Sequence, residues 1–300
     1  MSEPISTAVT GVAVAAGKEI AANASKGIGQ TVSDMWYAIY GYKWSEKRQM
    51  KEIEVARNIE KFKEEITNKA AKIPEDNKQE PDIDIIGLTL DAAKFRINKD
   101  EIRNMFSNLI VSAMDNSKSH DIHPSFSEMI KQLSPLDAQN LYSLYHYQDE
   151  TISKIIINFE HNGYRESYSH IYLANPDCKI NELIAPSIEN LIRLKLVDVT
   201  YSEYKTAENA YDAHFKSSLY LDLKKEIENR IKNDKSTIEI LGNVSIPYVI
   251  GHDNKILSED ERLALKVKLE KNLFKDVELQ KGVIQLTALG RNFCKICLSE

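Results

Sequence analysis

The sequence is poor in the features that usually identify a chemistry or a compartment. Its 300 residues include only three cysteines, too few for a disulfide framework, so a reducing compartment is expected. The first residues lack the basic segment of a secretory signal peptide. The uncharged run from Pro4 to Gly17 is shorter than the roughly 20 residues that a transmembrane helix needs. These absences favour a cytoplasmic protein.

Recognisable catalytic motifs are also absent. Gly27 and Gly29 do not follow a strand pattern, so they do not form a phosphate-binding loop. No serine stands in a nucleophile elbow, and no carboxylate pair is set apart from the many surface ones. Cys294 and Cys297 continue the apolar stripe of a closing helix, which indicates burial rather than metal binding. We therefore predict no catalytic residues, no metal ligands and no cofactor, although an unsupported enzyme activity stays open.

Basic charge is scarce in the middle of the chain. The net charge is −6, and residues 74–176 hold 9 Lys and Arg against 16 Asp and Glu. Nucleic acids are bound chiefly by clustered basic side chains. This balance disfavours nucleic acid as a partner.

The amino-terminal segment has an unusual composition. Residues 5–39 follow a helical period, with a second row of glycine, alanine and serine at every fourth position. Such small residues let two helices approach closely, and the aromatic cluster that follows suits either a membrane boundary or a core edge. We expect this segment to self-associate, to contact a membrane, or to pack on the next helix. The candidate residues are Gly17, Ala21, Gly29, Trp36, Tyr40 and Trp44.

The central segment, residues 45–148, is predicted to be entirely helical. Asn98 and Glu101 are spaced as a capping box, and Pro124 and Pro135 are expected at the first positions of two consecutive helices. His120 and His123 precede the first of these helices. They could be ligands of a zinc site, but no Cys, Asp or Glu residues elsewhere have the spacing of a zinc-binding motif. We therefore expect His123 to form a hydrogen bond with a backbone group in the turn.

The carboxy-terminal part changes in character after residue 148. The β-branched run at 151–160 predicts a strand, and a helix is expected to turn into a strand at Leu196. A last strand leads to Thr287, the expected cap of the closing helix. Between the last two strands, residues 205–280 form an insertion with its own helices, one of them starting at a Ser258–Glu261 capping box and running to Phe274.

The stretches LIRLKLV and LTALG look like the latter half of a winged helix. On the presumed recognition helix, Asn190, Arg193 and Lys195 are the candidate nucleic-acid contacts. The sequence thus predicts a mostly α-helical fold, with a helical amino-terminal half and a winged-helix-like α+β carboxy-terminal half. The expected divisions are residues 1–44, 45–148 and 149–300.

The central motif also resembles a known family, Abi-alpha (abortive infection), and similar patterns flank it over most of the chain outside the insertion. The resemblance implies a bacterial cytosolic protein of phage defence and implies no established chemistry. His123, Pro124, Phe126, Ser134 and Pro135 are the marks of the motif in its hinge. The full set that carries the resemblance is Met105, Phe106, Asn108, Leu109, His123, Pro124, Phe126, Ile130, Leu133, Ser134 and Pro135.

These observations lead to one functional hypothesis and one alternative. The first is a non-enzymatic defence protein, triggered by a phage or host protein, whose amino-terminal helix acts on the inner membrane or self-associates into a homo-oligomer. It would rest in the cytoplasm or at the membrane periphery. The alternative is a winged-helix nucleic-acid-binding regulator, or a sensor of phage DNA.

Overall fold

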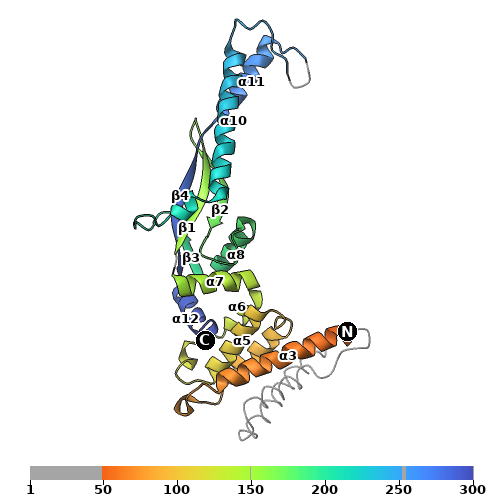
Figure 1. The fold of residues 1–300 in the computed structure, drawn as a ribbon, viewed down its shortest axis with the longest axis vertical. Coiled ribbons are helices and arrows are strands. Elements are labelled where there is room, and N and C mark those ends of the chain that lie inside the picture. The colour runs from red at the N-terminus through yellow and green to blue at the C-terminus, as the bar shows by residue number, and fades with distance from the viewer. Residues whose placement is uncertain (1–48, 149, 252–254, 300) are drawn as a thin grey trace, which may run out of the picture. The chain divides into compact units, whose positions relative to one another are not determined.

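The computed structural model describes residues 49–148, 150–251 and 255–299, which form two compact units (Figure 1). Unit 1 holds the described residues up to Gln148, together with Asn190–Val197 and the chain from Leu286 onward. Unit 2 holds the remainder, Asp149–Glu189 and Asp198–Gln285. Helices predominate and one four-stranded sheet is present, so the predicted mostly helical class is confirmed.

Unit 1 is a group of helices built around α5. The apolar side chains of α5 recur every three or four residues, and those of Ile102, Phe106 and Ile110 are fully buried. Around α5 pack α3, α4, α6, α7 and α12. The bounds are α3 Gln49–Ala70, α4 Ile83–Ala93, α5 Asp100–Ala113, α6 Phe126–Gln132, α7 Pro135–Tyr147 and α12 Ala288–Cys297, with short 3-10 turns at Glu75–Asn77 and Ser119–Asp121.

The ends of these helices agree only partly with the predictions. α7 begins at Pro135, as predicted, and Ser134 and Asp137 exchange the two hydrogen bonds of a capping box. Thr287 caps α12 by accepting the Gly290 N–H at 2.8 Å. The predicted Asn98–Glu101 box is wrong, because the cap residue is Lys99 without a side-chain bond. The Glu101 carboxylate instead accepts a hydrogen bond from the Gln139 side chain at 2.9 Å.

The predicted position of Pro124 is also wrong. α6 begins two residues later than the sequence suggested, at Phe126. Pro124 lies in a turn that the Phe126 N–H closes on the His123 carbonyl at 2.9 Å. The chain therefore completes a separate turn before it becomes helical.

Unit 2 is built on a sheet with the strand order β2-β1-β4-β3, in which β1 pairs antiparallel with β2 and β4. β1 and β3 lie where the sequence predicts strands. β2 was missed, since most of its side chains are exposed or half-buried and show no apolar alternation. β4 begins at Phe274, well inside the predicted insertion and beyond the helix expected to include that residue. The bounds are β1 Thr151–Phe159, β2 Tyr164–Ile171, β3 Val197–Thr200 and β4 Phe274–Leu286.

One long helix, α10, covers a face of this sheet (Figure 1). Tyr220 and Ile227 of α10 pack against apolar side chains of the strands, including Ile155 and Leu279. α11 runs back along α10 and forms a helical hairpin with it. α11 begins with the predicted Ser258–Glu261 capping box. The bounds are α8 Asn181–Arg193, α9 Asp212–Phe215, α10 Ser218–Gly242 and α11 Glu259–Lys271.

The winged-helix comparison is not confirmed. α8 does lead into β3, and β4 does lead into α12, in the predicted order. In the four-stranded sheet, however, β4 lies between β3 and β1 and pairs with β1 over nearly its whole length. The two presumed wing strands are therefore part of a larger sheet that also contains β1 and β2.

Candidate functional site

The candidate residues of the amino-terminal segment lie outside the described residues. Gly17, Ala21, Gly29, Trp36, Tyr40 and Trp44 all belong to this group. Their role in self-association or membrane contact stays a prediction.

His123 occupies the hinge between the short turn at Ser119–Asp121 and α6. Its exposed ring nitrogen Nδ1 accepts the Ser125 N–H at 3.2 Å and lies 2.7 Å from the Ser125 hydroxyl. The ring thus satisfies a backbone donor that has no helical partner, as the sequence analysis expected. In the described part of the chain, no group of three or more His, Cys, Asp or Glu side chains is placed to hold a metal ion.

Asn190 and Arg193, the candidate nucleic-acid contacts, make hydrogen bonds within unit 1. The Asn190 amide donates to the Asp137 carboxylate at 2.8 Å and to the Gln132 carbonyl at 3.1 Å. Arg193 donates to the Gln132 side chain at 2.9 Å and to Asn190. Lys195 is exposed and has a left-handed backbone, φ +58°, at the end of α8. These bonds give Asn190 and Arg193 a structural role, and nucleic-acid binding stays a prediction.

Cys294 and Cys297 face the interior of unit 1. Both side chains are fully buried, and desolvation raises the pKa of both thiols well above the ordinary value. A thiol reacts as its thiolate, so these cysteines are inert packing groups at neutral pH. The expected burial is confirmed.

A serine and a histidine meet in the core of unit 2. The Ser153 hydroxyl lies 2.8 Å from His214 Nδ1, and His214 Nε2 lies 3.3 Å from the Thr151 hydroxyl. Such a pair could activate a nucleophile, but Ser153 and His214 are buried, which leaves no room for a substrate. The contact fixes α9 against β1. Sequence reasoning missed this contact because 61 residues separate the two side chains.

A second polar cluster lies at an irregularity in the sheet. The β1–β2 register shifts between Ser153 and Ile155, and at this place His170 adopts a left-handed backbone with φ +47°. The Tyr201 hydroxyl lies 3.1 Å from His170 Nδ1 and accepts the His170 N–H at 3.3 Å. The ammonium group of Lys154 lies 4.8 Å from the centre of the Tyr201 ring and 3.2 Å from the Glu166 carboxylate. The bulge thus turns His170 toward Tyr201.

Burial changes the protonation of this cluster. Desolvation lowers the pKa of His170, against the opposing charges of Glu189 and Glu166, while Lys154 lowers it further. Desolvation likewise raises the pKa of Tyr201 above its ordinary value. Both rings are therefore neutral at pH 7, where the Tyr201 hydroxyl bonds the His170 ring and the His170 backbone N–H.

Acidification should destabilise unit 2 through His170. The folded-state pKa lies below the unfolded value of about 6.5, so the unfolded chain binds the proton first and stability falls as the pH drops from about 6.5 through the folded pKa. A His170→Asn variant keeps a residue that tolerates the left-handed backbone and removes the titration. Urea unfolding from pH 7 to pH 5 should show a shallower loss of stability in this variant. His161→Asn, at an exposed position, is the control, and an unchanged slope in His170→Asn would refute the assignment.

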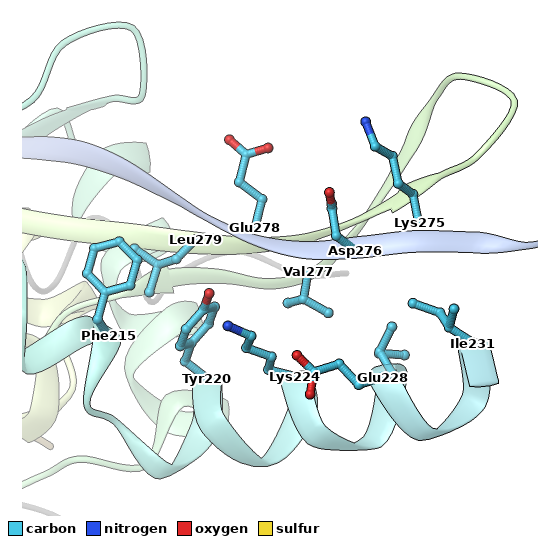
Figure 2. Close-up of a pocket in the computed structure, with 11 residues that line it drawn as sticks. Phe215, Tyr220, Lys224, Glu228, Ile231, Lys275, Asp276, Val277, Glu278 and Leu279 are labelled. Carbon is cyan, nitrogen blue, oxygen red and sulfur yellow. The ribbon is translucent and has the colours of Figure 1, made fainter.

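A groove of about 450 Å³ runs between α10 and β4 (Figure 2). Val277 and Leu279 of β4 point toward α10, while Asp276 and Glu278 point away from it. Six of the eleven residues that line the groove are apolar or aromatic, and five are charged. Its α10 and α9 side is lined by Phe215, Tyr220, Lys224, Ile227, Glu228 and Ile231.

The α10–α11 hairpin exposes much apolar surface. The loop between the two helices includes Val244, with 96 % of its surface exposed, and the exposed side chains of Tyr248, Ile250 and Ile256. α11 has no buried residue at all. Proteins seldom leave such groups of large apolar side chains open to water without a binding role. The sequence did not predict this surface, because exposed apolar residues on a helix can have the same spacing as buried ones.

Among the helices that the structure describes, none combines the length and the apolar composition needed to cross a lipid bilayer.

Comparison with known proteins identifies the family. The family model described as "Abortive infection alpha" matches residues 54–297, a range that covers most of the described residues of unit 1 and all of unit 2 with its hairpin. No curated protein and no solved structure match the chain. The match spans far more than half of the sequence and agrees with the resemblance carried by the central hinge motif. The chain belongs to the abortive infection alpha family.

Proposed function

We propose that this protein acts in abortive infection as a cue-triggered defence protein that works through macromolecular contacts and not through catalysis. Membership of the abortive infection alpha family supports the defence role. The exposed apolar loop at the end of the α10–α11 hairpin is the observation that carries the contact mechanism.

The trigger is a phage or host protein that binds the hairpin loop. Val244, Tyr248, Ile250 and Ile256 offer it large apolar side chains that need no rearrangement to become accessible. Tyrosine is enriched at the centre of protein interfaces, where charged residues are depleted. The loop is anchored to α11, because the Arg262 guanidinium donates to the carbonyls of Leu241 and Asn243 at the end of α10 and to the Ile246 carbonyl within the loop.

The effector is the amino-terminal segment. In the resting protein it stays in the cytoplasm or at the membrane periphery, and after the trigger binds it acts on the inner membrane or self-associates. The row that includes Gly17, Ala21 and Gly29 and the cluster that includes Trp36, Tyr40 and Trp44 support this step by their residue types and spacing.

Single substitutions in the amino-terminal segment test the effector step. Gly17→Leu should block close helix approach, and Trp36→Ala should remove an interfacial ring, so each variant should lose most of the protection against phage plaques. Dye entry into infected cells and leakage from liposomes measure the membrane effect directly. Val244→Ser, in the hairpin loop, should lose protection without changing liposome leakage by the purified protein. Full protection by both Gly17→Leu and Trp36→Ala would rule out the membrane mechanism.

A further inference from the structure

The face of α11 that points away from α10 has an outward stripe of exposed side chains with an acidic end, an apolar middle and a basic end. Asp260, Ala264, Val267 and Lys271 follow one another at intervals of four, three and four residues, so they lie along one stripe of the helix. All four are exposed, and Leu263 stands beside the stripe with 60 % of its surface exposed, compared with 54 % for Val267. The stripe is thus apolar in the middle, acidic at one end and basic at the other.

The opposite face of α11 holds the helix in place. Arg262 donates hydrogen bonds to the carbonyls at the end of α10, and Lys266 lies 3.7 Å from Glu270 along the same side. The amino end is fixed by the Ser258–Glu261 capping box. Because the Arg262 bonds reach the end of α10, they set the rotation of α11, and the outward stripe has one orientation within the hairpin.

We propose that the outward stripe of α11 binds the same stripe of a second copy of this protein, with the two helices antiparallel. A two-fold axis between Ala264 and Val267 places Asp260 of each copy opposite Lys271 of the other. It also places Val267 opposite the small side chain of Ala264, which allows close approach, and Leu263 packs beside Val267 of the other copy. Two ion pairs therefore enclose an apolar centre.

The distribution of charge along α11 favours a second copy of this protein over other binding partners. An acidic first turn and a basic last turn are complementary to the same helix only when the two run in opposite directions. From Glu259 to Lys271 the helix has four acidic and four basic residues, so it lacks the basic excess that favours an anionic lipid surface. The contact involves α11 and not the hairpin loop, and it is independent of the proposed trigger site.

Charge reversal of the full-length protein gives a direct test by sedimentation over a range of concentrations. Asp260→Lys alone and Lys271→Glu alone each create two like-charged pairs across the axis, and each should raise the dimer dissociation constant by about tenfold or more. An equimolar mixture of the two variants should dimerise again. In the mixed dimer the introduced lysine faces the introduced glutamate, and the retained Asp260 faces the retained Lys271, so both pairs are attractive. The double variant Asp260→Lys/Lys271→Glu should also restore the dimer.

The controls separate this contact from other modes of association. Asp222→Lys reverses an exposed charge on α10 and should leave the dissociation constant unchanged. Val267→Asp should abolish the dimer in every charge background, and circular dichroism should show unchanged helix content because Val267 is exposed. A wild-type protein that stays monomeric at about 100 µM would overturn the proposal, as would a dimer that survives each single charge reversal. The second outcome would place self-association elsewhere and leave the defence mechanism intact.

Discussion

Truncation of Phe126 to alanine is expected to destabilise unit 1 by roughly 3–5 kcal/mol, the usual range for deleting a buried aromatic ring. Phe126 begins α6 and is 0 % exposed. Its ring meets that of Phe293 in α12 edge to face, with the centroids 5.2 Å apart. The truncation would leave a cavity between two helices that come from distant parts of the sequence, so local relaxation cannot close it easily.

Chemical denaturation followed by circular dichroism measures this loss. Phe95→Ala is the matched control, because Phe95 is 70 % exposed and its removal should cost well under 1 kcal/mol. His123→Asn should also cost only about 1 kcal/mol, since the ring is exposed and its main contact is the hinge hydrogen bond. Equal losses for Phe126→Ala and Phe95→Ala would contradict the assignment of Phe126 to the core.

Two glycine-to-alanine substitutions in unit 1 are expected to change stability in opposite directions. At Gly290, in the first turn of α12, an added Cβ would stand 1.9 Å from the backbone carbonyl oxygen of Leu196. The methyl group therefore forces the helix away from the chain that precedes β3 and strains the Thr287–Leu196 backbone bond. We expect Gly290→Ala to destabilise by at least the upper end of the roughly 1–3 kcal/mol range for overpacking.

Gly87 provides the matched comparison. It lies within α4, and an added Cβ would meet nothing within 4 Å. Alanine has the higher helix propensity, so Gly87→Ala should stabilise by about 0.5–1 kcal/mol. Melting curves of both variants suffice for the measurement. A Gly290→Ala variant as stable as the wild type would mean that α12 can shift freely at its start.

The sequence predicted those parts of the fold in which local rules decide the outcome. The three- and four-residue spacing of α5 marked a buried helix, and Ser134, Ser258 and Thr287 marked helix starts by their cap chemistry. The strand β1 was evident from its β-branched residues. The family resemblance was carried by the hinge around His123, and the match over residues 54–297 confirms it.

The features that sequence reasoning missed depend on distant partners. β2 is stabilised by pairing with β1 although its own side chains are mostly polar. The Asn98–Glu101 spacing satisfied a local rule, but Glu101 bonds Gln139 instead. Likewise, nothing local indicates that His170 meets Tyr201, or that Leu263 and Val267 stay exposed although their spacing suits a buried face. In each case a tertiary contact, or its absence on an open surface, overrides the local pattern.

The division of unit 1 into three chain segments affects how the protein is made. During synthesis α7 leaves the ribosome about 140 residues before α12, a delay of roughly 7–28 s at about 5–20 residues per second. In that interval the Phe126 side chain lacks its contact with Phe293, and unit 1 exposes part of its core. When synthesis has just reached α12, the nascent chain is therefore an incomplete unit 1 attached to a fully synthesised unit 2. Translation that stalls before α12 would deliver this species to chaperones and proteases.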